Sequence, residues 1–553
     1  MKLKRIKLLS PFRGLPKNFE FSFSSDFESN ENVEPICLVG LNGSGKSNAL
    51  EVIAEMFYYL ENLDTSSKKN LNKFKTQFGF EIEYFVPKIS LAGSGFIWDD
   101  LDDLTFADLD ENQLIQIIKN PNELPKIKVF FNDSFVEVKN FYNNDISKIL
   151  PKHIIGYSSG FNELLSNPFI KLNFEYYQQI KNKTNNAKES ILEMNRFQFL
   201  DYNISKLVTI SNFIFDNSIS NIGVTLNLEI LKDELKIESL HEFSIHISLK
   251  KNKIFEKYLP EELEDVIQKF KEIDPFYEES VKSNKSFDSI NFKFNFKLTV
   301  VIVDAFRIKF NSAAQLFRAL YFFQILNIGN ISRNINNRVK NTLAGSSENL
   351  SDLIPKYEIE KQSFHLGNIS FIKKGFSDPV YYKHFSDGEH QLLQILGSVI
   401  LLDYNSTLFL LDEPETHFNP EWRSKFIWLI NECLKSNNED NIREQEFLLT
   451  THSPFLISDS KKENVIWLIS DKVDSPKEVS INTYGTSVTR LINEFFGKRR
   501  QIADLSWTEM LLDVQSNNID ELNESLSKFG ESHEKDMILQ KLNKLLADKK
   551  HGQ

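Results

Sequence analysis

A short segment near the start of the chain has the residue types and spacing of a phosphate-binding loop. Residues 40–47 read GLNGSGKS and fit the pattern G-x-x-x-x-G-K-[ST] without a mismatch. Glycines there let backbone N–H groups point at phosphate oxygens, and the helix that follows adds its positive N-terminal end. The pattern predicts that Lys46 bridges two phosphates of ATP and that the Ser47 hydroxyl ligates Mg²⁺. The residues expected to contact the nucleotide here are Asn42, Gly43, Ser44, Gly45, Lys46, Ser47 and Asn48.

A second pattern is an apolar run that ends in two carboxylates. Residues 408–411 read LFLL and lead into Asp412, Glu413 and Pro414. This is typical of a buried parallel strand that delivers acidic side chains to the edge of a sheet. We expect Asp412 to hold Mg²⁺ through water, and Glu413 to orient and deprotonate the attacking water.

A third apolar run, residues 447–451, ends at His452. A histidine at such a strand end can donate a hydrogen bond to the terminal phosphate, and it follows the carboxylates by one strand-helix unit. The expected catalytic residues are therefore Glu413, Lys46 and His452.

A fourth segment, FSDGE at residues 385–389, precedes the apolar helical run 392–402. Serine and glycine ahead of a helix N-terminus form an anion site, although such a turn is common. Its significance comes from its position shortly before Asp412. Ser386, Gly388 and Glu389 are the nucleotide contacts expected from it.

The elements that must position these motifs alternate between strands and helices. Strands are expected at 19–25, 35–39, 79–86, 126–131 and 154–157, and an amphipathic helix at 47–60. Between 161 and 360 the sequence mixes expected helices (189–196, 260–272, 313–328) with alternating strands (243–250, 292–302) and has no phosphate signature. The sequence therefore predicts an α/β protein with a large α+β insertion.

Four regions follow from this pattern. Residues 1–160 and 365–500 are the expected N- and C-terminal parts of the nucleotide-binding unit, and 161–364 are the insertion. Residues 501–553 are an expected helical tail whose last part, 517–553, is charged and suits a surface or partner-binding helix pair.

Composition narrows the function classes. With 41% hydrophobic and 26% charged residues, the 553-residue chain is ordinary for a globular protein, and no apolar run approaches the roughly 20 residues that span a bilayer. Cys37 and Cys433 are the only cysteines, so a disulfide framework is not expected. We expect a cytoplasmic location, where the environment is reducing.

The net charge of −12 leaves DNA contact only to local basic patches. The candidates are Lys373, Lys374, Lys383 and the run 498–500. The acidic run 98–111 is expected to be a solvated face.

The order of the motifs resembles that of the ABC-type ATPases, in the group that contains SMC, RecF-like, OLD-family and AAA_21-like proteins. The resemblance implies an ABC/SMC-type P-loop head, a mixed sheet with flanking helices, that binds ATP and Mg²⁺. It implies a homodimer or higher even-numbered oligomer in which Ser386 and Gly388 of one subunit reach the ATP of another. Residues 415–420 occupy the position of the segment that couples the two sites, and 157–163 are the candidate switch loop. Asp387 and Phe385 depart from the usual glycine and leucine.

Three further segments, SPFRGLPKNFEF, LVGLNGSGKSNALE and HIIGYSSGFNELLSNPF, resemble restriction-system-associated AAA ATPases of bacterial defence loci. These are similar to the ATPase subunits of Septu-type and retron-linked anti-phage systems. The resemblance implies an ATPase subunit that senses a trigger and controls a separate nuclease or toxin. The alternative is a DNA-repair or recombination ATPase that acts directly on DNA.

Overall fold

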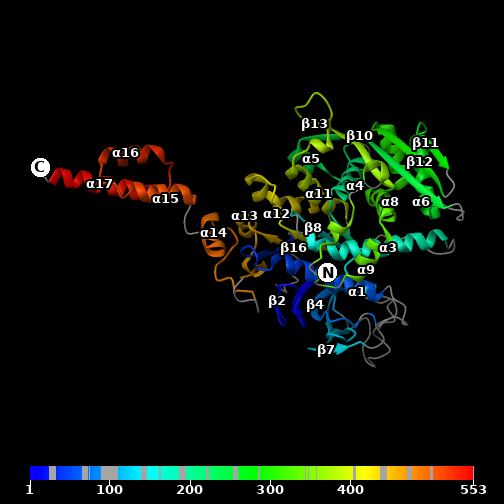
Figure 1. Cartoon of the computed structure of the whole chain (residues 1–553), viewed down its shortest axis with the longest axis horizontal. Coiled ribbons are helices and arrows are strands. Elements are labelled where there is room, and N and C mark those ends of the chain that lie inside the picture. The colour runs from blue at the N-terminus through cyan, green and yellow to red at the C-terminus, as the bar shows by residue number, and fades with distance from the viewer. Residues whose placement is uncertain are drawn as a thin grey trace.

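The structure of the chain is a computed structural model (Figure 1). It describes residues 1–23, 33–64, 73, 75–88, 110–131, 133–138, 146–160, 163–185, 195–219, 222, 225–252, 259–283, 287–342, 344, 346, 348–355, 358–402, 406–435, 445–469, 476–497 and 502–551. Among these residues, no helix has the length and apolar character needed to cross a membrane.

A six-stranded sheet forms the centre of the molecule, and every neighbouring pair in it is parallel. The strands, in spatial order, are β17 (Val465–Trp467), β3 (Ile36–Val39), β16 (Gln445–Thr451), β15 (Thr407–Asp412), β8 (His153–Ser158) and β9 (Phe197–Phe199). Strands β3, β15 and β16 are buried along their whole length. Their continuous apolar runs suit a parallel sheet that is covered on both faces.

Successive side chains of these strands enter two different cores. Leu38, Leu408 and Leu448 pack with helix α1 (Lys46–Asp64) on one face. Val39 and Phe409, on the opposite face, pack with α4 (Tyr202–Ile214), α11 (Asp387–Leu401) and α12 (Pro420–Lys435). The period of two along each strand therefore separates α1 from α11 by the thickness of the sheet.

An antiparallel sheet shares the core of α1. Its strands, in spatial order, are β2 (Glu20–Ser22), β1 (Lys2–Leu8), β4 (Phe80–Pro87), β5 (Asn112–Lys119), β6 (Lys126–Phe131) and β7 (Ser134–Glu137). Leu3, Ile6 and Ile82 pack in the same core as α1. The carboxylate of Glu446 on β16 accepts the Leu3 N–H at 2.8 and 3.0 Å, which joins this sheet to the central one.

A second antiparallel sheet lies on the other side of the molecule (Figure 1). Its strands are β11 (Glu278–Ser283), β12 (Phe287–Lys297), β10 (Ile237–Asn252), β13 (Phe364–Lys373) and β14 (Val380–Tyr381). Phenylalanines 292, 294 and 296 alternate along β12 and pack with α6 (Glu261–Ile273), α7 (Val300–Phe310) and α8 (Ala313–Ile325). Further helices of the described residues are α2 (Ile146–Ile149), α3 (Asn167–Asn185), α5 (Glu229–Leu235), α9 (Arg333–Asn341), α10 (Leu350–Leu353) and α13 (Pro454–Ser458).

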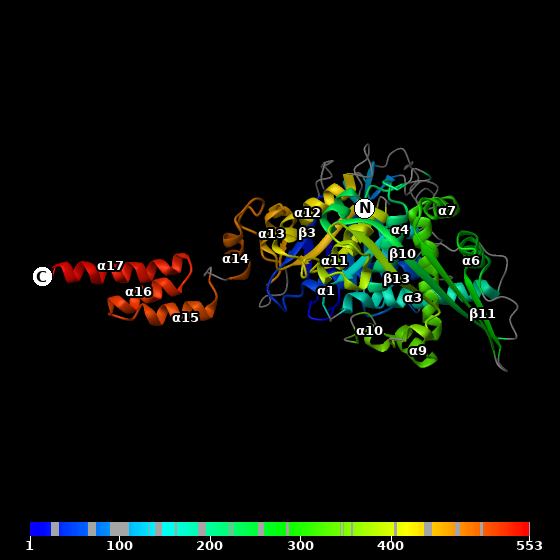
Figure 2. The ribbon, with the colours of Figure 1, turned by 90° about the horizontal axis from the view of Figure 1, so that it is seen from above.

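The C-terminal helices form a cluster of their own. Helix α14 (Val488–Phe496) packs on the main body, whereas α15 (Asp504–Asp513), α16 (Ile519–Lys528) and α17 (Asp536–His551) surround a small separate core. Figures 1 and 2 both show this cluster standing away from the rest of the molecule. The described part of 517–553, where a helix pair was expected, contains the two helices α16 and α17, and α15 precedes them.

The sheets differ in three respects from the expected arrangement. The strand expected at 292–302 stops at Lys297, because Thr299 caps α7 by accepting the Ile302 N–H. Strand β9 lies within the expected insertion, 161–364, but pairs with β8 of the central sheet. Strand β13 begins where the insertion was expected to end, yet it pairs with β10, a strand of the insertion. The antiparallel strands lie in separate sheets, so the central sheet is parallel and not mixed. Most of the helix expected at 189–196 lies outside the described residues.

Candidate phosphate-binding site

Four neighbouring strands of the central sheet carry the predicted motifs at their carboxyl ends. The loop 40–47 follows β3, and His452 follows β16. Asp412 is the last residue of β15 and Glu413 comes directly after it, while Ser158 is the last residue of β8. The parallel register pairs Asp412 with Thr450 on one side and with Ser158 on the other. This edge is where open α/β sheets bind their ligands.

The loop after β3 requires glycine at two of its positions. A Cβ on Gly40 would lie 2.2 Å from the Leu468 carbonyl oxygen, and Gly45 has a φ of +90°. The Lys46 ammonium donates to the carbonyl oxygens of Gly40 and Leu41, at 3.0 and 3.1 Å. Burial lowers the pKa of Lys46, although nearby Glu413 and Asp412 oppose that shift. The loop therefore holds one cation close to its backbone.

Asp412 is the point at which the motifs meet. Its Oδ1 accepts hydrogen bonds from Ser47 Oγ at 2.9 Å and from Thr450 Oγ1 at 2.6 Å, and Oδ2 accepts from Ser158 Oγ at 3.4 Å. Burial raises the pKa of Asp412, and the hydroxyl donors act against that shift. A hydroxyl and a carboxylate side by side are oxygen ligands of the kind that Mg²⁺ takes.

Glu413 has an unusual backbone conformation at the edge of the site. Its φ is +50°, in the left-handed region that costs a non-glycine residue on the order of 1 kcal/mol. Its N–H donates to Thr450 Oγ1 at 2.9 Å, and its carbonyl oxygen accepts from Thr416 Oγ1 at 3.0 Å. These two bonds hold the turn that leaves the Glu413 carboxylate half-buried beside the loop.

His452 faces Glu413 across the end of β16. Its Nε2 lies 3.4 Å from Glu413 Oε1, and this buried nitrogen makes no hydrogen bond within the described part of the chain. Burial and the charge of Lys46 lower the pKa of His452, against the carboxylates of Glu413 and Asp412. The Ser44 hydroxyl in the loop is also buried and has no hydrogen-bond partner among the residues that the structure describes. Together with the loop N–H groups, these polar atoms fit a polyphosphate with Mg²⁺.

The remaining loop residues lie at its outer side. Asn42 and Gly43 are exposed, and Asn48 is partly buried in the first turn of α1.

The segment 385–389 lies on the opposite face of the central sheet from α1. Ser386 caps α11 in a reciprocal capping box with Glu389, whose second oxygen is 2.5 Å from Lys373 Nζ. Burial by itself would raise the pKa of Glu389. The hydrogen bonds with Lys373 and Ser386 outweigh burial, so that the pKa is lowered. A Cβ on Gly388 would lie 2.7 Å from the His417 carbonyl oxygen. Because α11 packs in one core and α1 in the other, this segment and the loop of the same chain are separated by the sheet.

Thr450 was not among the site residues expected from the sequence, yet it connects Asp412 with the Glu413 backbone. Two threonines at the end of an otherwise apolar strand were the available signal for it. Glu415, the first residue of the segment 415–420, is buried, accepts a hydrogen bond from Thr451, and has its pKa raised to about 7 by burial.

The basic residues considered for DNA contact are partly engaged elsewhere. Lys373 pairs with Glu389, and Lys374 pairs with Asp233 at 3.0 Å. Lys383 is exposed. The run 498–500 and most of the acidic run 98–111 lie outside the described residues.

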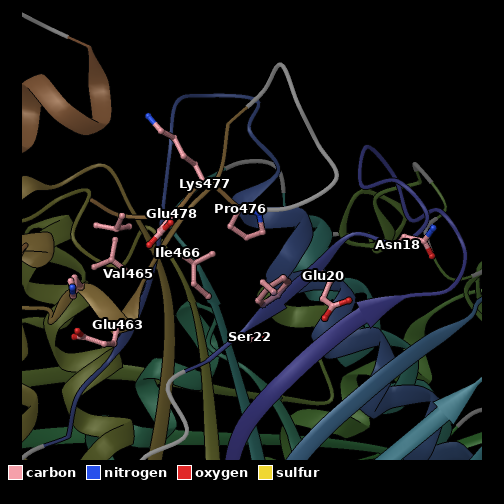
Figure 3. A pocket seen from close by; sticks show the side chains of 12 residues that line it. Asn18, Glu20, Ser22, Glu463, Val465, Ile466, Pro476, Lys477 and Glu478 are labelled. Carbon is pink, nitrogen blue, oxygen red and sulfur yellow. The ribbon is translucent and has the colours of Figure 1, made fainter. Parts of the chain in front are cut away.

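A cavity of about 630 Å³ lies between β2 and the segments 462–466 and 476–479 (Figure 3). It is lined by Asn18, Glu20, Phe21, Ser22, Lys462, Glu463, Val465, Ile466, Pro476, Lys477, Glu478 and Val479. None of the motif residues lines it, and its charges have both signs. We therefore place the candidate site at the strand ends, where the polar groups converge.

Comparison with protein families gives one match. Residues 36–458 match the family AAA_21, described as AAA domain, putative AbiEii toxin, Type IV TA system. A comparison with curated proteins finds no significant match. The matched residues run from the strand before the phosphate loop to the helix after His452 and so include all four motifs.

Proposed function

This chain belongs to the AAA_21 family, and on that premise we propose that it is the ATP-binding and ATP-hydrolysing subunit of a bacterial anti-phage defence system. The observation that carries the proposal is the meeting of Ser47 and Asp412, 2.9 Å apart, beside Lys46, Glu413 and His452. Phosphate-binding, metal-binding and base groups thus occupy one edge of the sheet.

The residues divide the work of hydrolysis among them. Lys46 leaves its loop carbonyls to bind the β- and γ-phosphates, and the loop N–H groups bind the same oxygens. Ser47 and Asp412 would hold Mg²⁺, which neutralises phosphate charge. Glu413 accepts a proton from the attacking water, and neutral His452 donates a hydrogen bond to the γ-phosphate. Thr450 holds Asp412 and Glu413 in place through its hydrogen bonds with both residues.

We further propose that the site is completed by a second copy of the chain. Ser386 and Gly388 lie across the sheet from their own phosphate loop, so a contact with nucleotide is open to them in another subunit. Such an arrangement gives a two-fold, head-to-head dimer with two ATP molecules between the subunits. Half of each site then arrives with the partner, and turnover is slow.

The defence role rests on the description of the family, which names a toxin and a toxin–antitoxin system. In this proposal the closed dimer senses a trigger and controls a separate nuclease or toxin protein. The protruding cluster α15–α17 is the surface proposed for that partner, because Leu505 and Leu512 are 72% and 61% exposed on it.

The test is ATP hydrolysis by the purified protein, with and without duplex DNA, beside Lys46→Ala and Glu413→Gln. We expect slow turnover that DNA does not change and that both variants lose, by at least about 100-fold in Glu413→Gln. Glu413→Gln should still bind ATP, whereas Lys46→Ala should not. Turnover that DNA raises several-fold would favour the alternative, an ATPase that acts directly on DNA.

A further inference from the structure

Gln391 joins three segments that surround the site. It lies on α11, one turn after Gly388, and only 2% of it is exposed. Its Nε2 donates to the Tyr157 hydroxyl at 2.8 Å, at the end of β8. Its Oε1 accepts the His417 N–H at 3.2 Å, in the segment that follows Glu413. One carboxamide thus uses both of its ends to hold α11, β8 and the segment 413–417 together.

The segment that Gln391 holds also positions Glu413. Thr416, next to His417, donates to the Glu413 carbonyl oxygen at 3.0 Å and lies 3.4 Å from Glu413 Oε2. The Thr416 hydroxyl is also 3.0 Å from Ser159 Oγ, just beyond β8. A displacement of the N-terminus of α11 is therefore passed to the base through a short chain of bonded groups.

Close packing gives this connection little slack. The Gly388 Cα faces the His417 carbonyl oxygen, and a single added Cβ would approach that oxygen to 2.7 Å. Helix α11 and the segment 413–417 are consequently in direct backbone contact one turn from Gln391. A rigid contact of this kind transmits small shifts instead of absorbing them.

We propose that Gln391 is a positioning residue that couples nucleotide contact at Ser386 to the placement of Glu413 in the same chain. The proposal rests on the proposed function, since it takes the nucleotide at Ser386 to be bound by a second copy. Gln391 is buried and both ends of its side chain are hydrogen-bonded within the protein, so it would act on hydrolysis through Glu413. Its role is to make each hydrolytic site respond to the occupation of the other.

The test compares Gln391→Leu and Tyr157→Phe with Gln394→Leu. Gln394 is a matched control because it is also buried and lies on the same helix, yet its side chain has no hydrogen bond to either segment among the described residues. For each protein, kcat, KM, ATP affinity, the Hill coefficient for ATP and the melting temperature are measured.

We expect Gln391→Leu to lower kcat by about 10-fold or more, because misplacing a reacting group by a fraction of an ångström is costly. ATP affinity should stay within about 3-fold, since the phosphate loop is untouched, and the Hill coefficient should fall from above 1 to about 1. Tyr157→Phe should change kcat and the Hill coefficient in the same direction by less, and Gln394→Leu should match the wild type.

Two results would overturn the inference while leaving the ATPase proposal intact. One is that the wild type hydrolyses ATP and Gln391→Leu has the same kcat and Hill coefficient as the wild type. The other is an equal loss in Gln394→Leu, which would show that any change in this helix lowers activity. A wild type that does not hydrolyse ATP would instead overturn the proposed function, and the inference with it.

Discussion

At the scale of single residues, the site depends on how hydroxyl groups hold two adjacent carboxylates apart. Asp412 and Glu413 are adjacent in sequence but have different proposed roles. The Thr450 hydroxyl bonds the side chain of Asp412 and the backbone N–H of Glu413, and so holds the two residues differently. The left-handed φ of Glu413 is maintained by these bonds. A buried threonine thus separates the proposed metal ligand from the proposed base.

Replacing Thr450 should reveal this role. In Thr450→Val the Glu413 N–H and the buried Asp412 lose a partner, and an unsatisfied buried polar group costs about 1–3 kcal/mol. We expect kcat for ATP to fall about 10-fold or more and the melting temperature to drop. Thr450→Ser, which keeps the hydroxyl, is the control and should retain most activity. A Thr450→Val enzyme with normal kcat would exclude the role.

At the scale of elements, buried carboxylates connect segments that are distant in the sequence. Glu446 on β16 is buried and accepts the Leu3 N–H of β1, and burial raises its pKa to about 7. Glu51 on α1 contacts Arg13 at 2.5 Å, and burial raises its pKa to about 7 as well. Each carboxyl group therefore binds its proton more tightly in the folded protein than in the unfolded chain.

This shift predicts a pH dependence of stability. A carboxyl group with a raised pKa in the folded state stabilises the fold fully below its unfolded pKa, and this contribution is lost as the pH rises through about 7. Between about pH 5 and pH 8 we expect the wild-type melting temperature to fall by roughly 2–5 °C more than that of Glu446→Gln. Thermal melts across this range measure the difference. An equal fall in both proteins would show that Glu446 is not responsible.

The sequence predicted the elements wherever one signal was strong. The apolar runs of β3, β15 and β16 and the helix after the phosphate loop lie where their patterns placed them. Residues 292–302 were misread because apolar alternation continues past Lys297, and only the cap at Thr299 stops it. The three-residue strand β9 is too short to produce a periodic signal.

Contacts between distant segments were beyond reach of the sequence. Nothing in the local pattern joins Gln391 to Tyr157, 234 positions away, or places α11 across the sheet from α1. Motif residues can be recognised from their spacing in the sequence, whereas the residues that position them can be recognised only once the fold brings them into contact. The candidate ligands were therefore predictable, and the threonine and glutamine that hold them were not.

At the scale of the whole molecule, helices α1 and α11, which carry the two halves of the proposed nucleotide site, lie on opposite faces of one sheet. The phosphate loop leads into α1, and Ser386 caps α11 on the other face. In the proposed dimer each subunit gives its phosphate loop to one ATP and its Ser386 to the other. The C-terminal cluster, set apart from this body, remains accessible to a further protein (Figure 2).

The central claim, that each ATP is shared between two copies, is tested most directly by mixing two inactive variants. Lys46→Ala disables the phosphate loop. Ser386→Asp keeps the helix cap but turns a carboxylate toward the partner's phosphates. A mixed dimer contains one site with both halves intact, so an equal mixture should regain up to about a quarter of wild-type ATP turnover. Turnover no greater than the sum of the two separate variants would contradict the shared site.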